Sequence, residues 1–130
     1  MVSGTKYDKE KLRFDLIPVR PLEEVARVYT IGARKYADRN WEGGMKWGRL
    51  YGALLRHAFA WWWGERFDKD NGQHHLAAVV FNALALMEYE EIHPELDDRP
   101  QVGRPQTRVL RAATKATRHK TVQLRRTPHH

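Results

Sequence analysis

The sequence predicts an all-α fold, and three observations support this prediction. Apolar residues recur at helical spacing over residues 21–36, and the segments 48–63 and 74–92 are apolar around most of a helical circumference. No segment alternates with period two for long enough to form a convincing strand. Because the second and third helices offer so little polar surface, we expect a helical bundle that is completed by oligomerisation.

The first expected helix begins at Pro21, whose missing N–H is not needed in a first turn, and ends near residue 36. Its apolar and small side chains share one face, which we expect to be buried: Leu22, Val25, Ala26, Tyr29, Ala33 and Tyr36. Residues 37–47 then contain the pair Gly43-Gly44, together with Asp and Asn residues that are typical of a loop.

Three consecutive tryptophans, Trp61, Trp62 and Trp63, end the second expected helix, and Gly64 marks its C-terminus. On a regular helix their side chains point in directions about 100° apart, so they do not form one stacking platform. We expect Trp61 to line a site, because it lies on the same face as His57. Trp62 and Trp63 are expected to fill the bundle or a subunit interface.

The composition sets limits on function. The chain has 130 residues, which fits one domain, and it has no cysteine. Disulfides, thiolate nucleophiles and thiolate zinc sites are therefore excluded. The N-terminal residues lack the apolar run of a signal peptide, and no stretch is long and apolar enough to cross a bilayer. We expect a soluble, cytoplasmic protein with no membrane partner.

The net charge of +7 is concentrated near the C-terminus. Nine of the 23 basic residues lie from Arg99 onward with no acid among them, which leaves 14 basic residues against all 16 acidic ones before that point. The composition after residue 96 is typical of a chain that does not fold alone. We therefore divide the sequence into a helical domain, residues 1–96, and a basic, flexible tail, residues 97–130.

Ionisable residues gather around the end of the second expected helix. On an uninterrupted helix, His57, Glu65 and Asp68 would lie along one stripe. His75 and Asn82 are seven residues apart and share a face of the third helix. If the two faces meet, they form an oxygen and nitrogen pocket for a divalent cation such as Mg²⁺ or Mn²⁺. Hydrogen-bonded core histidines and solvated carboxylates are the alternative interpretation of the same residues.

The connection between the first two helices offers a second candidate site. Cations suit phosphate oxygens, an asparagine suits a base edge, and Trp or Tyr suits stacking on a base or sugar. A solvated turn with aromatic anchors is the alternative, and the residues alone favour it. The residue types that suggest binding are those of Lys35, Tyr36, Arg39, Asn40 and Trp41.

Five motifs in a specific order resemble the phage family of dATP/dGTP diphosphohydrolases, the MazZ-like family. They are DLIP (15–18), GARKYADRNW (32–41), LLRH (54–57), GERFD (64–68) and HLAAVVFN (75–82). Each motif is weak alone, but their order and spacing are specific, and the match covers about residues 6–92. The resemblance implies an all-α fold related to MazG-like pyrophosphohydrolases, assembled as dimers or tetramers.

The resemblance also implies an activity. Family members use divalent metal ions, Mg²⁺ or Mn²⁺, to hydrolyse a purine deoxynucleoside triphosphate, dATP or dGTP, to the monophosphate and pyrophosphate. In some phages this reaction remodels the nucleotide pool, and the dGMP formed feeds the synthesis of 2-aminoadenine nucleotide. The expected substrate partner is therefore a purine deoxynucleoside triphosphate.

Roles for individual residues follow from the same resemblance. Glu65 and Asp68 are the expected metal ligands, with His57 and His75 as further ligands or orienting groups, and Glu65, Asp68 and His57 are the expected catalytic residues. The substrate-binding set has two parts. Phosphates would be held by Lys35, Arg39 and Arg56, and the base or sugar would be contacted by Tyr36, Asn40, Trp41, Asp15 and Asn82.

The sequence departs from the family pattern at two points. MazG-like enzymes carry an E-x-x-E motif before an E-x-x-D motif, whereas here Glu65–Asp68 precedes the pair Glu88–Glu91. A second histidine that follows the H-L motif in the family is replaced by Ala78. The set of metal ligands is therefore expected to differ from that of MazG-like enzymes.

The basic tail predicts a different class of function, a non-enzymatic nucleic-acid-binding helical dimer. Truncation after Asp98 should abolish salt-dependent binding of DNA or RNA, because it removes all nine clustered cations. Fluorescence anisotropy of a labelled oligonucleotide at increasing salt concentration measures this effect. Equal binding by the full and truncated chains would assign nucleic-acid binding, if any, to the helical domain.

Overall fold

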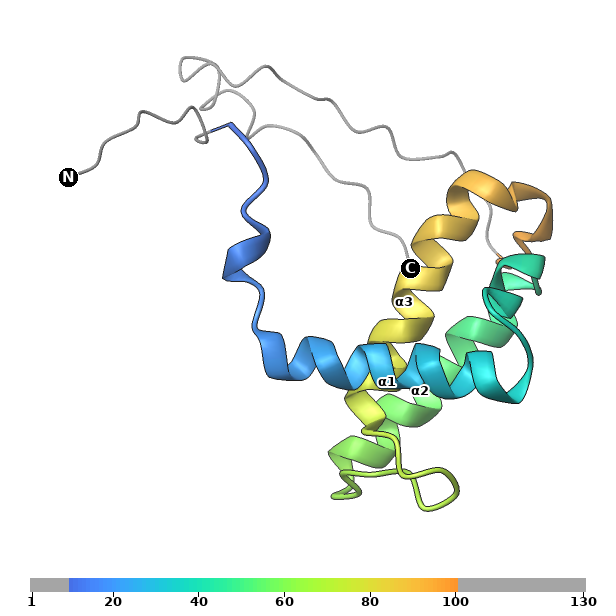
Figure 1. Ribbon diagram of the computed structural model, residues 1–130. Coiled ribbons are helices and arrows are strands. Elements are labelled where there is room, and N and C mark those ends of the chain that lie inside the picture. Colours follow the sequence, from blue (N-terminus) through green and yellow to red (C-terminus); the bar gives the residue numbers. More distant parts are fainter. Residues whose placement is uncertain (1–9, 101–130) are drawn as a thin grey trace, which may run out of the picture. The chain divides into compact units, whose positions relative to one another are not determined.

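The computed structural model describes residues 10–100, and within this range it shows three α-helices and no strand (Figure 1). The α-helices are α1 (Val19–Lys35), α2 (Trp47–Trp62) and α3 (His75–Ile92), and the short 3-10 helices are η1 (Phe14–Leu16), η2 (Asn40–Gly43) and η3 (Pro94–Leu96). The predicted all-α fold is confirmed. None of the helices in this part of the chain has both the length and the apolar character needed to cross a membrane.

The residues up to Asp98 form one compact unit, and a second unit begins at Arg99. All three α-helices belong to the first unit. The predicted basic tail, residues 97–130, lies outside the described residues from position 101 onward. Its flexibility and its nucleic-acid binding stay predictions.

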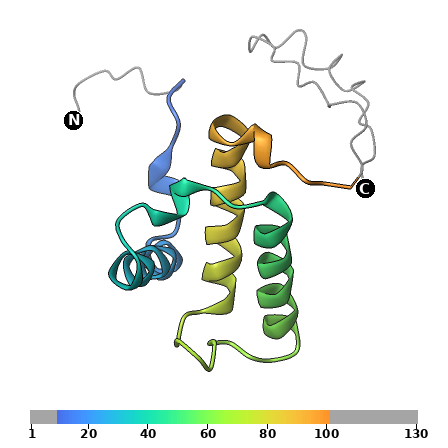
Figure 2. The ribbon, with the colours of Figure 1, turned by 90° about the vertical axis from the view of Figure 1, so that its right-hand side faces the viewer.

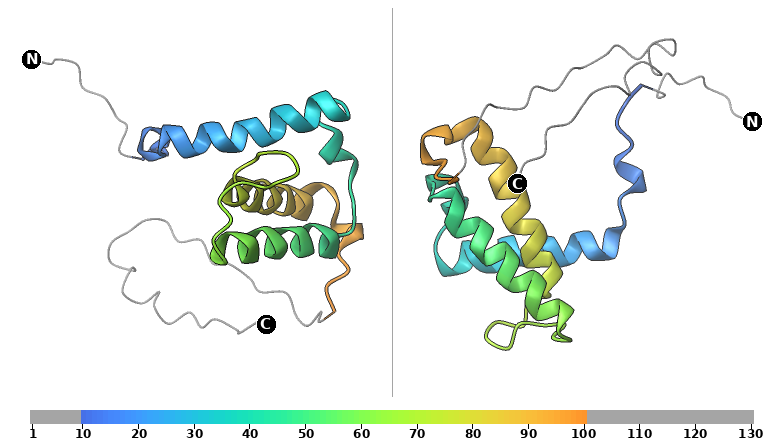
Figure 3. Two further views of the ribbon diagram at one scale, coloured as in Figure 1. Left: turned by 90° about the horizontal axis from the view of Figure 1, so that it is seen from below. Right: turned by 180° about the vertical axis from the view of Figure 1, so that it is seen from behind.

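Helices α2 and α3 lie side by side as an antiparallel hairpin, and α1 crosses α3 as a second layer (Figures 2 and 3). The loop between α2 and α3 lies at one end of the hairpin. The segments that precede α2 and follow α3 meet at the other end. The two ends of the bundle are therefore formed by different segments of the chain.

Two apolar clusters hold these layers together. One joins α2 to α3 through Trp47, Leu50, Ala85 and Tyr89, and the other joins α1 to α3 through Val25, Val28 and Ala77. The alanines of α3 are small enough to let its neighbours approach closely, and Ala85 has no exposed surface at all. Burial of these side chains is the main stabilising contribution to the helix packing.

The buried face of α1 differs from the predicted one. Val25 and Val28 are buried and Tyr29 packs edge-on against Phe81, but Leu22 is exposed, as is Tyr36. Crossed helices touch over only a short length. Apolar residues near the ends of α1 therefore stay exposed within residues 10–100, although their spacing is helical. The helix also begins at Val19 rather than at residue 21.

The outer surfaces of α2 and α3 remain apolar in the single chain. Trp62 is 77% exposed and Trp63 is 84% exposed, so the prediction that these two side chains fill the bundle is wrong for one chain. Trp62 is the last residue of α2, and Trp63 follows it as the C-cap. Their burial in a subunit interface, and the homodimer or homotetramer itself, stay predictions. Further exposed apolar residues on these helices are Tyr51, Phe59, Val80, Leu84 and Met87.

Polar contacts fasten the end of the bundle opposite the α2–α3 loop. The indole N–H of Trp47 donates to the carbonyl oxygen of His93 at 3.1 Å, and the Tyr89 hydroxyl donates to the carbonyl oxygen of Trp41. Asp98 accepts a hydrogen bond of 2.8 Å from the backbone N–H of Gly48, in the first turn of α2. The first N–H groups of a helix have no intrahelical partner, so Asp98 caps α2 from fifty residues away in the sequence.

We expect Gly44→Ala to destabilise the fold by about 1–3 kcal/mol. Gly44 has a φ of 100°, and an added Cβ would lie 2.8 Å from Cδ1 of Leu96 and 2.9 Å from Nε2 of His93. Gly43→Ala is the matched control, because a Cβ at Gly43 meets no atom within 4 Å. Urea unfolding of the two variants measures the difference in the free energy of unfolding. Equal stability of both variants would contradict the prediction.

His93 predicts a dependence of stability on pH. Its Nε2 lies 2.8 Å from the Glu42 carbonyl oxygen and its Nδ1 lies 2.9 Å from a Glu95 carboxylate oxygen. Both partners only accept, so both ring nitrogens must donate, and these bonds raise the pKa of His93 above its ordinary 6.5. The stabilisation is complete below pH 6.5 and declines as the pH rises through the raised pKa.

The urea midpoint of the wild-type chain should therefore fall over this range of pH by more than that of His93→Gln. Glutamine retains a donor group, its side-chain NH₂, but does not titrate. The other histidines are common to both chains, so the difference between the two pH profiles isolates His93. Parallel profiles would contradict the prediction.

Candidate metal centre

The loop of residues 63–74 joins α2 to α3 and reverses the direction of the chain. Gly64 ends α2 with a φ of 109°, which favours glycine, and Phe67 then forms an isolated antiparallel bridge with His74. The N–H of Asp68 donates to the Gln73 carbonyl oxygen at 2.8 Å. These contacts hold Asp68 against the first turn of α3.

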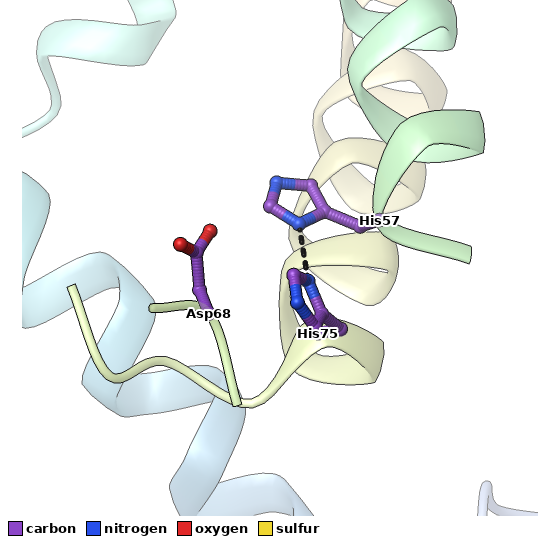
Figure 4. A group of neighbouring side chains, drawn as sticks. All are labelled: His57, Asp68 and His75. Carbon is purple, nitrogen blue, oxygen red and sulfur yellow. Dashed lines mark hydrogen bonds between the residues drawn. The ribbon is translucent and has the colours of Figure 1, made fainter. Parts of the chain in front are cut away.

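This reversal brings together His57 of α2, Asp68 of the loop and His75 of α3 (Figure 4). One donor atom from each lies within 4.8 Å of those of the other two. His75 is only 4% exposed, whereas His57 and Asp68 are half-buried. Two imidazoles and one carboxylate at these separations are a donor set for a divalent metal ion.

Hydrogen bonds fix the orientation of His75 on both sides. Its Nε2 lies 2.7 Å from Oε1 of Glu65, and its Nδ1 lies 2.9 Å from Nδ1 of His57. Because the Glu65 carboxylate can only accept, Nε2 of His75 is the donor in that pair. In the neutral ring Nδ1 then carries the lone pair, and it accepts from Nδ1–H of His57.

The same contacts shift the pKa values of the groups. Burial lowers the pKa of His57, the neighbouring His75 and Arg56 add to this effect, and the Asp68 carboxylate opposes it. The hydrogen bond from His75 lowers the pKa of Glu65. At neutral pH the site therefore presents a neutral His57 ring and an ionised Glu65, the forms in which these groups accept a proton or bind a cation.

Asp68 is oriented by its own loop. Its Oδ1 accepts a 2.8 Å hydrogen bond from the backbone N–H of Asp70, which forms a local turn of the kind that Asp favours. Its other carboxylate oxygen accepts no hydrogen bond within residues 10–100. One oxygen of Asp68 thus anchors the side chain and the other is left to bind.

The residues expected at a metal site do come together, but not along the predicted stripe. The helix ends at Trp62, so Glu65 and Asp68 reach the site by chain reversal rather than by helical spacing. Glu65 contacts His75 and does not belong to the cluster of three donor groups. Lys69, which the sequence analysis did not select, lies 3.5 Å from Oε2 of Glu65. Its only sequence signal is the spacing of four residues from Glu65.

The predicted substrate-binding residues of the turn after α1 lie away from the cluster of His57, Asp68 and His75 in the single chain. Trp41 is half-buried between Tyr29 and Tyr89, with ring centroids at 6.2 Å and 6.3 Å. Tyr89 follows His75 by fourteen residues, which is about 21 Å along a helix. Trp41 is therefore an aromatic anchor of the fold, in agreement with the alternative interpretation. Its neighbours in the turn are exposed at the same end: Lys35, Tyr36, Arg39 and Asn40.

The other predicted substrate residues have different surroundings. Arg56 is exposed beside His57, and its charge lowers the pKa of that histidine. Asn82 is 5% exposed and its amide donates to the Ala78 carbonyl oxygen at 2.9 Å. Asp15 is exposed and pairs with Arg13 at 2.8 Å. Of the predicted phosphate ligands, Arg56 is the one adjacent to the cluster.

The fold and the site together define a small helical domain with a candidate centre for a divalent metal. Comparison with known proteins identifies the group to which such a domain belongs. The family model described as dATP/dGTP diphosphohydrolase, N-terminal, matches residues 1–99. The chain belongs to this family, and the resemblance predicted from the motifs is confirmed.

The chain is also similar to a curated protein of the same family. The dATP/dGTP diphosphohydrolase of Salmonella phage PMBT28 is 36% identical over 98 residues, which cover 75% of this chain and 33% of the relative. The chain thus spans about a third of the length of the curated relative that it matches. No solved structure matches the chain.

Proposed function

We propose that this domain carries out the metal-dependent hydrolysis of dATP and dGTP to the deoxynucleoside monophosphate and pyrophosphate. The observation that carries the proposal is the cluster of His57, Asp68 and His75 within the segment matched to the family. The name of the phage relative supplies the substrates. In a phage, the reaction would remodel the nucleotide pool of the host cytoplasm, and it would supply dGMP for 2-aminoadenine synthesis where that pathway exists.

The donor groups fit a divalent cation. His57, Asp68 and His75 would hold it, and Glu65 would keep the His75 ring in place through its bond to Nε2. A bound divalent cation neutralises phosphate charge and lowers the pKa of water. Arg56, exposed beside His57, would contact the phosphate chain as a permanent positive charge.

The reaction balances with one water molecule. The water oxygen bonds to the α-phosphorus, the bond from that phosphorus to the α–β bridging oxygen breaks, and pyrophosphate leaves with the electron pair. A proton must be removed from the water. The half-buried carboxylate of Asp68 lies in the cluster, so it can accept that proton or orient the water.

Incubation with dATP or dGTP and Mn²⁺ should release deoxynucleoside monophosphate and pyrophosphate in equal amounts, measured by chromatography. Asp68→Asn should lower turnover by at least about 100-fold, because it removes a negative ligand of the cation. Asp70→Asn is the matched control in the same loop, since the Asp70 side chain is exposed and lies outside the cluster. Absence of monophosphate from every nucleotide tested would overturn the proposed function.

A further inference from the structure

We propose that His57, Asp68 and His75 form a six-coordinate site for a transition-metal dication such as Mn²⁺ or Co²⁺, and that this site binds Mg²⁺ more weakly than these ions. The use of this site in catalysis rests on the proposed function. The metal preference rests only on the donor groups and their geometry. Four observations support it.

The first observation is the chemistry of the donors. Two of the three groups are imidazoles, which suit borderline transition metals, whereas Mg²⁺ takes oxygen ligands and is usually held by carboxylates and substrate phosphates. Asp68 is the one carboxylate in the cluster. The nearby Glu65 directs an oxygen to Nε2 of His75 at 2.7 Å, so that oxygen is already engaged.

The second observation is the separation of the two imidazoles. Two nitrogens that lie 2.9 Å apart, each about 2.1 Å from one ion, subtend roughly 90° at that ion. This is the angle between neighbouring ligands of an octahedron. A tetrahedral zinc site would separate the same nitrogens by about 3.4 Å. At their hydrogen-bonded spacing, the two nitrogens therefore match neighbouring ligands of a six-coordinate ion.

The third observation concerns the proton between the rings. In the neutral pair, one Nδ1 donates to the other, and the line between the two nitrogens lies beside the Asp68 carboxylate (Figure 4). If the proton on Nδ1 of His57 moves to Nε2 of the same ring, Nδ1 has a free lone pair. A cation can then bind between the two Nδ1 atoms. The two rings then turn both Nδ1 lone pairs to the ion without a change in the net charge of either ring.

The fourth observation is the support behind the ligands. The carboxylate of Glu65 lies behind His75 as in the carboxylate–histidine–metal arrangements of known sites, and it fixes Nδ1 as the nitrogen that faces the cluster. The Asp70 N–H similarly holds one oxygen of Asp68. Three protein ligands leave coordination positions for water or for phosphate oxygens, which a catalytic site requires.

Isothermal titration of the metal-free full chain with MnCl₂, CoCl₂ and MgCl₂, without nucleotide, tests the proposal. We expect one Mn²⁺ or Co²⁺ per chain and a Mg²⁺ affinity at least about 10-fold lower. The Co²⁺ form should show the weak visible absorption of six-coordinate cobalt. Equal affinity for Mg²⁺, or the intense absorption of tetrahedral cobalt, would overturn the proposal.

Two variants link the binding to these residues. His57→Gln should abolish the one-to-one binding of Mn²⁺, and Glu65→Gln should weaken it by about 10–100-fold because the His75 ring is less firmly held. Glu91→Gln, on the exposed surface of the last turn of α3, is the matched control and should bind as the wild type does. Circular dichroism verifies the fold of each variant, and wild-type Mn²⁺ affinity in folded His57→Gln would overturn the assignment.

The results separate this inference from the proposed function. Selective Mn²⁺ binding in a chain that hydrolyses no nucleotide supports the metal site and overturns the hydrolase proposal. Hydrolysis that proceeds in a chain without selective Mn²⁺ or Co²⁺ binding supports the hydrolase proposal and overturns the metal preference.

Discussion

The side chain of His75 is held between Glu65 on one side and His57 on the other, and the geometry of the candidate site depends on this pair of hydrogen bonds. A histidine that is 96% buried at the start of a helix has no access to bulk water for its two ring nitrogens. Both must find protein partners. The partners come from the end of α2 and from the loop that follows it, so satisfying His75 also fixes the position of the loop.

The rest of the fold supplies the frame for this contact. Alanines on α3 allow α2 to approach closely, and the cluster around Tyr89 and Trp47 fixes the far end of the hairpin. Helix α1 adds a second layer through Val25 and Val28. Because the two ends of the hairpin are fastened by different contacts, a substitution such as Gly44→Ala can change stability at one end and leave the donor groups at the other end in place.

In one chain, the predicted substrate-binding turn and the cluster of donor groups lie at opposite ends of the α2–α3 hairpin. The turn with Lys35 and Asn40 lies with the Trp41 anchor, about 21 Å along α3 from His75. Arg56, beside His57, and Lys69, which pairs with Glu65, are cations close to the cluster. The exposed apolar surfaces of α2 and α3, which include Trp62 and Trp63, are extensive for a domain of this size. They are the surfaces that the predicted oligomer would cover.

The sequence by itself determined the helices and the loop after Gly64, because helical periodicity and turn residues are local signals. It predicted four metal ligands, His57, Glu65, Asp68 and His75, of which the structure brings three into the cluster. It also determined the family, since the order of five short motifs can be recognised without any knowledge of the contacts between residues. Only the tertiary structure decided that Glu65 supports His75 while Asp68 joins the cluster, and that Trp41 is an anchor of the core. These distinctions depend on which way a reversing loop and a crossing helix bring side chains together, and spacing along the chain does not contain that information.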